Sequence, residues 1–257
     1  MRVLILGVAL IVVLSCVTIV INARVAATTN VVPPPSLVAL INSSAPQDDL
    51  SGSQFCAGVL IAVDRVLTAR HCVSARSPST VDAIVGADNL CSTAPINGVR
   101  RSILRILAYS QEDGDGAVLV LDRAVSALPA KAVRSAPTSA VEAWGWGKSA
   151  VGGVAPCRAE QKRLRIVDSA HCADVLNQED PTARSNYFCA LPSAVRNTCE
   201  GDSGGPVFVG SLTGSLLGIV AAGDGCGRMD SGSYLLAAGY GHLDAQLQVP
   251  STILSER

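Results

Sequence analysis

The chain has 257 residues, a formal net charge of -1, 49% hydrophobic and 16% charged residues. The balanced charge argues against a nucleic-acid-binding protein, which would carry a strong excess of basic residues. So apolar a chain is not intrinsically disordered. Glycine and proline are scattered along it without a repeat of fixed period, which excludes a coiled coil or a helical solenoid.

The N-terminal segment has the pattern of an export signal. Arg2 precedes an uncharged apolar run over Val3–Ile21, and small residues follow up to Ala27. This pattern predicts a secretory signal peptide, with a short activation segment, over residues 1–27. The run is also long enough for an uncleaved signal-anchor, which would be the expected attachment of this chain to a membrane.

Short apolar runs rich in Val, Ile and Leu then follow one another between turn residues, which predicts an all-β protein. The runs are Leu37–Ile41, Ala57–Val63, Arg65–Thr68, Val81–Val85, Ile103–Ala108, Ala117–Leu121, Val141–Trp144, Val207–Val209 and Leu216–Ala221. Helical patterns occur at Ala170–Leu176 and in the tail His242–Leu247. A proline-containing connector at residues 124–137 predicts two small barrels, over residues 28–130 and, with a C-terminal helix, over residues 131–257.

The number of cysteines points to an oxidising compartment. Nine are present, and one of them lies inside the apolar run. The remaining eight, an even number, suit four disulfides, so we expect a secreted, extracellular protein. Zinc binding is the competing interpretation. Because the sequence has no C-x-x-C pair and only three histidines, we predict no metal site.

The stretch Gly201-Asp202-Ser203-Gly204-Gly205-Pro206 is the most informative part of the sequence. Glycines on both sides of one serine allow a tight turn that leaves its hydroxyl exposed and directs backbone N–H groups into a site. The same residues are ordinary turn formers, so the stretch alone does not establish a catalytic site.

Two further residues stand at the ends of predicted strands. His71 follows one strand in Thr68-Ala69-Arg70-His71-Cys72, and Asp115 precedes the strand at residues 117–121. The order His, Asp, Ser along an all-β chain is that of the chymotrypsin-type catalytic triad. Asp113 competes with Asp115, but only Asp115 places the following apolar residues in the register of the motif. His171 and His242 lack the T-A-x-H-C context.

With these motifs the chain resembles the trypsin/chymotrypsin-like serine endopeptidases. The T-A-x-H-C, D-x-A-L/V-L and G-D-S-G-G-P motifs are all present, with Arg70 where the family usually has alanine, and the resemblance extends from about Val25 to the C-terminus. It implies two packed six-stranded antiparallel β-barrels with the site between them. It also implies the disulfides Cys56–Cys72, Cys172–Cys189 and Cys199–Cys226, which leaves Cys91 and Cys157 as the remaining pair.

The resemblance also implies a role for each site residue. Ser203 would attack the substrate carbonyl, His71 would take and return the proton, and Asp115 would orient the imidazole. The backbone N–H groups of Gly201 and Ser203 would form the oxyanion hole. No cofactor is needed. The expected partners are protein or peptide substrates and protein inhibitors of proteases, not nucleic acid.

In this family a cut after a basic residue frees an N-terminus whose ammonium pairs with the aspartate before the nucleophile, here Asp202. Arg24-Val25-Ala26-Ala27 stands at the corresponding place, with alanine at both glycine positions. We therefore predict an activation cleavage after Arg24 and an ion pair between Val25 and Asp202. The alternative is a signal-peptidase cut after Ala27, which would remove Val25.

The same resemblance places Asn197 at the base of the primary specificity pocket and Gly223 and Gly232 on its walls. Because a neutral amide offers no charge for Arg or Lys, we expect a large neutral P1 residue. Asp224 and Asp230 lie near in the sequence and would favour a basic side chain instead.

Two functions from different classes remain open. Ala221-Ala222-Gly223 replaces the S-W-G of the family, so the serine that donates to the triad aspartate is absent. This favours a catalytically weak homologue that binds proteins as a decoy, whereas the complete triad favours an active endopeptidase. An α/β-hydrolase esterase would need the chain order Ser, Asp, His and is excluded.

Overall fold

The computed structural model describes residues 31–46, 50–91, 97–110, 113–133, 140–168, 170, 186–193, 197–210, 215–223, 226 and 233–237. Contacts divide the chain into residues 1–32 and residues 33–257, and strands β1 to β12 all lie in the second unit. Short 3-10 turns accompany the strands: η1 (Ser51–Ser53), η2 (Arg70–Cys72) and η3 (Pro78–Thr80).

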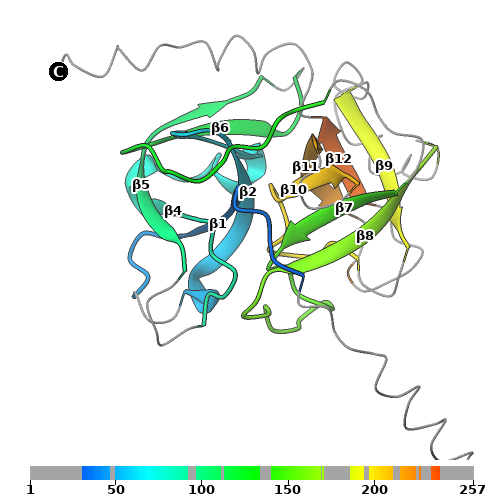
Figure 1. Ribbon diagram of the computed structural model, residues 1–257, viewed down its shortest axis with the longest axis horizontal. Coiled ribbons are helices and arrows are strands. Elements are labelled where there is room, and N and C mark those ends of the chain that lie inside the picture. Colours follow the sequence, from blue (N-terminus) through cyan, green and yellow to red (C-terminus); the bar gives the residue numbers. More distant parts are fainter. Residues whose placement is uncertain are drawn as a thin grey trace, which may run out of the picture. The chain divides into compact units, whose positions relative to one another are not determined.

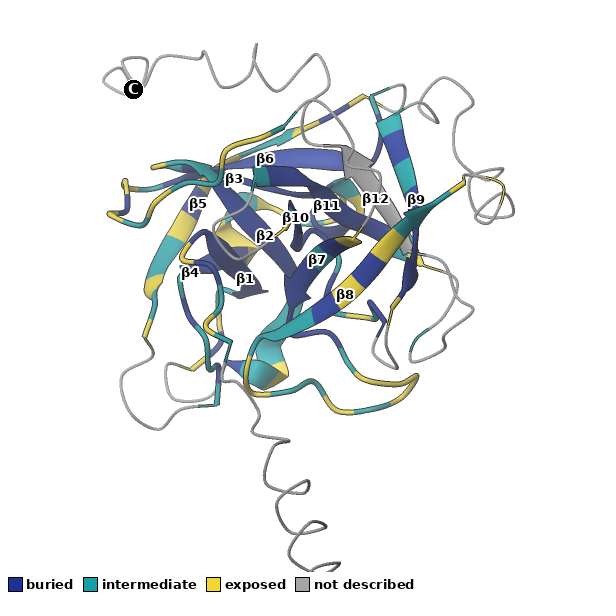
Figure 2. Cartoon of the chain, turned by 45° about the vertical axis from the view of Figure 1, so that its right-hand side comes forward, coloured by how far each residue is buried: buried dark blue, intermediate teal, exposed yellow. Residues whose placement is uncertain are grey.

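The first six strands close into an antiparallel barrel in the order β1-β2-β3-β6-β5-β4. They are β1 (Leu37–Asn42), β2 (Gln54–Ala62), β3 (Arg65–Ala69), β4 (Val81–Val85), β5 (Val99–Ala108) and β6 (Gly116–Leu121). Every residue of β3, β4 and β6 is buried, which Figure 2 shows as continuous dark blue. Closure also removes the free strand edges that an open sheet exposes.

The other six strands close into a second antiparallel barrel in the order β10-β11-β12-β9-β8-β7 (Figure 1). They are β7 (Ala140–Gly145), β8 (Glu160–Val167), β9 (Tyr187–Pro192), β10 (Pro206–Val209), β11 (Ser215–Gly223) and β12 (Ser233–Ala237). Its core contains Val141, Ala143, Leu164, Ala190, Val207, Leu217 and Val220.

The all-β class and the two six-stranded barrels are confirmed, and each predicted apolar run coincides with a strand. The sequence patterns missed β8, β9 and β12. In β8 the reason is visible, because Arg163 and Arg165 are exposed and alternate with buried Lys162 and Leu164, so the segment has little apolar character. Residues 1–27 and both predicted helices, apart from Ala170, lie outside the described residues. Within the described part of the chain, no helix has the length and apolarity needed to cross a membrane.

A disulfide joins the two barrels. Cys91, between β4 and β5, is bonded to Cys157, between β7 and β8, across a sequence separation of 66 residues. Beside it the Leu90 N–H donates to the Cys157 carbonyl at 2.8 Å, and Arg158 pairs with Asp88 at 2.9 Å. The linkage therefore lies within a small set of contacts between the barrels.

We expect the double variant Cys91→Ser/Cys157→Ser to lose about 4 kcal/mol of unfolding free energy, because opening so long a loop restores entropy to the unfolded chain. Denaturant unfolding measures the loss. Arg158→Gln, which removes only an exposed ion pair, is the matched control and should cost less than about 1 kcal/mol. Equal unfolding midpoints for the double variant and the unmodified chain would contradict a stabilising role.

Candidate active site

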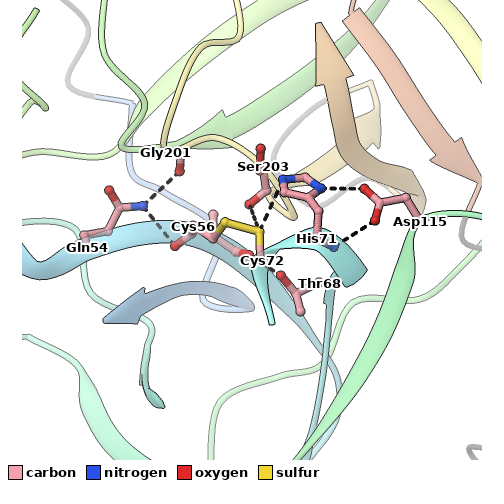
Figure 3. The surroundings of a disulfide bond; sticks show 9 residues. Gln54, Cys56, Thr68, His71, Cys72, Asp115, Gly201 and Ser203 are labelled. Carbon is pink, nitrogen blue, oxygen red and sulfur yellow. Dashed lines mark hydrogen bonds and ion pairs between the residues drawn. A yellow bond between two sulfur atoms is a disulfide. The ribbon is translucent and has the colours of Figure 1, made fainter. Parts of the chain in front are cut away.

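Strand pairing brings His71 and Asp115 together. β3 ends at Ala69 and β6 begins at Gly116, and these two residues are partners in the antiparallel ladder. The turn η2 then carries His71 back toward the start of β6. As a result Asp115 Oδ2 lies 2.6 Å from His71 Nδ1, and Asp115 Oδ1 accepts the His71 backbone N–H at 2.8 Å (Figure 3). The carboxylate thus holds the imidazole through Oδ2 and the backbone of the same histidine through Oδ1.

The surroundings of Asp115 differ from the family pattern. The Asp115 N–H donates to the hydroxyl of Tyr187 at 2.7 Å, and Tyr187 belongs to β9 of the second barrel. Arg70 Nε lies 4.0 Å from Asp115 Oδ1. Ala221 is buried in β11 and offers no hydroxyl. Asp113 instead accepts a hydrogen bond from Ser110 Oγ at 2.7 Å, at an exposed position.

Ser203 lies beside this pair, over the disulfide between Cys56 and Cys72 (Figure 3). Cys72 Sγ is 3.7 Å from His71 Nε2 and 3.8 Å from the Ser203 carbonyl oxygen, so the imidazole and the serine are neighbours. The Ala57 N–H of β2 donates to that carbonyl at 2.7 Å and ties Ser203 to the first barrel. The Ser203 hydroxyl makes no hydrogen bond to a described residue, which is common before substrate tightens a catalytic hydrogen bond.

A metal does not fit at this place. The ligand-type atoms of Cys56, His71 and Cys72 lie within 4.8 Å of one another. However, the two sulfurs are bonded to each other, and a metal ligand must be a free thiolate. Of the other cysteines, Cys199 and Cys226 form a disulfide and Cys189 is disulfide-bonded, while Cys172 lies outside the described residues.

Two amides in the serine loop are available to a ligand. The N–H groups of Asp202, Gly204 and Gly205 donate to carbonyl oxygens of the protein, whereas those of Gly201 and Ser203 have no acceptor among the described residues. Gln54 Nε2 donates to the carbonyl oxygens of Gly201 and Cys56, at 2.9 Å each, so the Gly201 carbonyl points away from the site. The amides of Gly201 and Ser203 are the two that the resemblance assigned to an oxyanion hole.

The loop depends on glycine. Gly201 and Gly204 have φ values of +96° and +79°, in the region that side chains disfavour. A Cβ on Gly204 would lie 2.2 Å from Thr68 Oγ1 and 2.3 Å from the Ala57 carbonyl oxygen. Only glycine therefore lets the serine loop approach the first barrel this closely.

Asp202 has a partner that the sequence did not indicate. Its Oδ1 lies 2.6 Å from Lys162 Nζ, and the side chains are only 1% and 2% exposed, respectively. The expected partner, Val25, lies outside the described residues. Lys162 stands at a buried position of β8, where a cation needs a buried anion, but the sequence patterns did not predict this strand.

A pocket opens beside Ser203. The residues that line it are Thr198, Cys199, Glu200, Ser203, Val220, Ala222, Gly223 and Cys226. Gly223 is one of them, and Asn197, the residue before Thr198, is 3% exposed and accepts the Thr198 N–H at Oδ1 at 2.8 Å. Gly232, Asp224 and Asp230 lie outside the described residues. Glu200, which sequence reasoning missed, pairs with Lys148 at 2.6 Å.

Two closed six-stranded barrels that bring a histidine–aspartate pair and a serine together are the arrangement of the chymotrypsin-like class of serine endopeptidases. Residues 24–239 match the trypsin family, and the chain belongs to that family. It is a trypsin-like serine endopeptidase, and it acts on protein or peptide substrates.

Individual relatives are distant. The chain is 28% identical to a trypsin of Saccharopolyspora erythraea, over 69% of this chain and 79% of the relative. It is 29% identical to trypsin eta of Drosophila melanogaster, over 69% and 70%, respectively. It is 30% identical to coagulation factor XII of Bos taurus, over 72% of this chain but 34% of that larger protein.

Proposed function

We propose that this protein is a secreted endopeptidase that hydrolyses peptide bonds through an acyl-enzyme on Ser203. The observation that carries the proposal is the bond between Asp115 and His71, next to a serine loop in which two amides have no acceptor among the described residues. Secretion is supported by the apolar N-terminal segment and by the disulfides.

In the proposed mechanism His71 Nε2 takes the proton of Ser203 as Oγ attacks the scissile carbonyl carbon. Asp115 holds Nδ1 and stabilises the imidazolium that forms. The N–H groups of Gly201 and Ser203 donate to the oxyanion. The imidazolium then protonates the leaving amine. In the second half of the reaction, deacylation, His71 activates a water that attacks the acyl carbon and releases the acid.

A decoy function is the second candidate, and Ala221 favours it, because the resemblance places at this position a serine that donates to the triad aspartate, and alanine has no hydroxyl. Asp115 keeps two other supports, since its N–H donates to Tyr187 and its carboxylate lies near Arg70. Such a decoy would bind peptides or protease inhibitors in the cleft without cutting them. The enzyme and the decoy are separated by turnover of an unstructured protein substrate, with Ser203→Ala as the matched control.

We expect a preference for a large neutral P1 residue. Among the described residues, the pocket walls include apolar Val220 and Ala222, and the acidic residue that lines it there, Glu200, is paired with Lys148. Fluorogenic peptides that differ only at P1 measure the preference. Phe or Leu should give kcat/KM at least about tenfold above Arg, a margin that pocket shape and charge can supply. A higher value for Arg than for Phe would refute this assignment.

A further inference from the structure

Both oxygens of the Asp202 carboxylate accept hydrogen bonds inside the second barrel. Oδ1 accepts from Lys162 Nζ at 2.6 Å and from the Gly147 N–H at 2.9 Å, and Oδ2 accepts from the Cys199 N–H at 3.0 Å. Lys162 Nζ also donates to the Gly145 carbonyl at 3.3 Å. A buried carboxylate needs such a cation and such donors to remain charged.

The backbone at the end of β7 leaves room around the Asp202 carboxylate for glycine only. A Cβ on Gly145 would lie 2.4 Å from Asp202 Oδ1, and a Cβ on Gly147 would lie 2.1 Å from Oδ2. Glycine at both positions lets the backbone of the β7 end close over the side chain. Lys162 enters from the adjacent strand β8, where it is paired with Ala143 of β7 in the ladder.

The position of Asp202 determines the shape of the serine loop. The Asp202 N–H donates to the Cys199 carbonyl at 2.9 Å, and the Gly205 N–H donates to the Asp202 carbonyl at 2.8 Å. With the Oδ2 contact to the Cys199 N–H, these bonds hold both sides of the turn that presents the amides of Gly201 and Ser203. Whatever cation holds Asp202 therefore holds the donors of the oxyanion hole.

We propose that Lys162 is the positioning residue that supplies this cation, in place of a new N-terminal ammonium at Val25. The chain then forms its oxyanion loop on folding, and cleavage after Arg24 is not needed for activity. This inference rests on the proposed function and deepens it, because it concerns how the same site is switched on.

The rate at which a fluorophosphonate labels the full secreted chain tests the proposal, because labelling needs both the nucleophile and the oxyanion donors. Arg24→Gln, which blocks the predicted cleavage, should label within about twofold of the unmodified chain, with its N-terminus identified by mass spectrometry. Lys162→Met should label at least about 100-fold more slowly, the effect of losing an oxyanion donor. Lys162→Arg keeps a cation and should recover most of the rate.

A second variant separates positioning from folding. Lys162→Met/Asp202→Asn removes the unpaired charge and should fold stably, yet it should still label slowly because the ion pair that positions the loop is gone. Recovery of the full rate in this double variant, an unchanged rate in Lys162→Met, or loss of labelling in Arg24→Gln would each overturn the role of Lys162. If the unmodified chain is not labelled at all, the proposed function fails first, and the inference fails with it.

Discussion

Replacing Ser203 or His71 by alanine should each lower kcat by roughly 10⁶-fold, and the double variant should be no worse, because the two side chains act as a unit. His71 is held by Asp115 at 2.6 Å, so Asp115→Asn, which would favour the wrong tautomer, should cost roughly 10⁴-fold. Steady-state hydrolysis of a P1-Phe peptide, with the folded fraction checked by circular dichroism, gives these ratios.

Asp113→Asn is the matched control for the carboxylate. The substitution removes the same charge two residues from Asp115. However, the Asp113 carboxylate accepts an exposed hydrogen bond from Ser110 Oγ, whereas the Asp115 carboxylate contacts the imidazole. Its kcat should stay within about threefold of the unmodified chain, as for a surface substitution. If Asp113→Asn were as damaging as Asp115→Asn, the assignment of the triad carboxylate would be wrong.

Lys162→Met should destabilise the protein by about 3–5 kcal/mol, because it leaves the charge of Asp202 buried and unpaired. Asp202→Asn on the same background removes that charge and should restore most of the loss. Lys148→Met is the comparison, because it breaks an ion pair that differs from Lys162–Asp202 in its burial. The Lys148–Glu200 pair has the same 2.6 Å separation, but its side chains are 32% and 63% exposed.

Water screens that exposed pair, so its loss should cost less than about 1 kcal/mol. Urea unfolding of the three variants measures the difference. Equal losses for Lys162→Met and Lys148→Met would show that the buried pair contributes no more than a surface pair.

Much of the site could be predicted because its residues stand in local motifs at strand ends. His71 follows β3 and Asp115 precedes β6, and the pairing of these two strands alone brings them together. Lys162 could not be found in this way. Its strand carries exposed arginines, and its partner is 40 residues away, so only the tertiary structure shows that this one cation faces inward.

The pocket shows the same limit. Resemblance placed Asn197 at its base, and the Asn197 side chain accepts the N–H of Thr198, a lining residue. Glu200 also lines the pocket, and no motif indicated it. Alignment fixes where a residue stands in the chain, whereas the packing of the loop decides which side chains face the substrate.

The most direct measurement is peptide mapping after treatment of the secreted chain with a fluorophosphonate. An activated serine should give one adduct on Ser203, formed rapidly and absent in both Ser203→Ala and His71→Ala. A chain that stays unmodified, or that is modified equally well without His71, would show that the serine beside the imidazole is not a nucleophile.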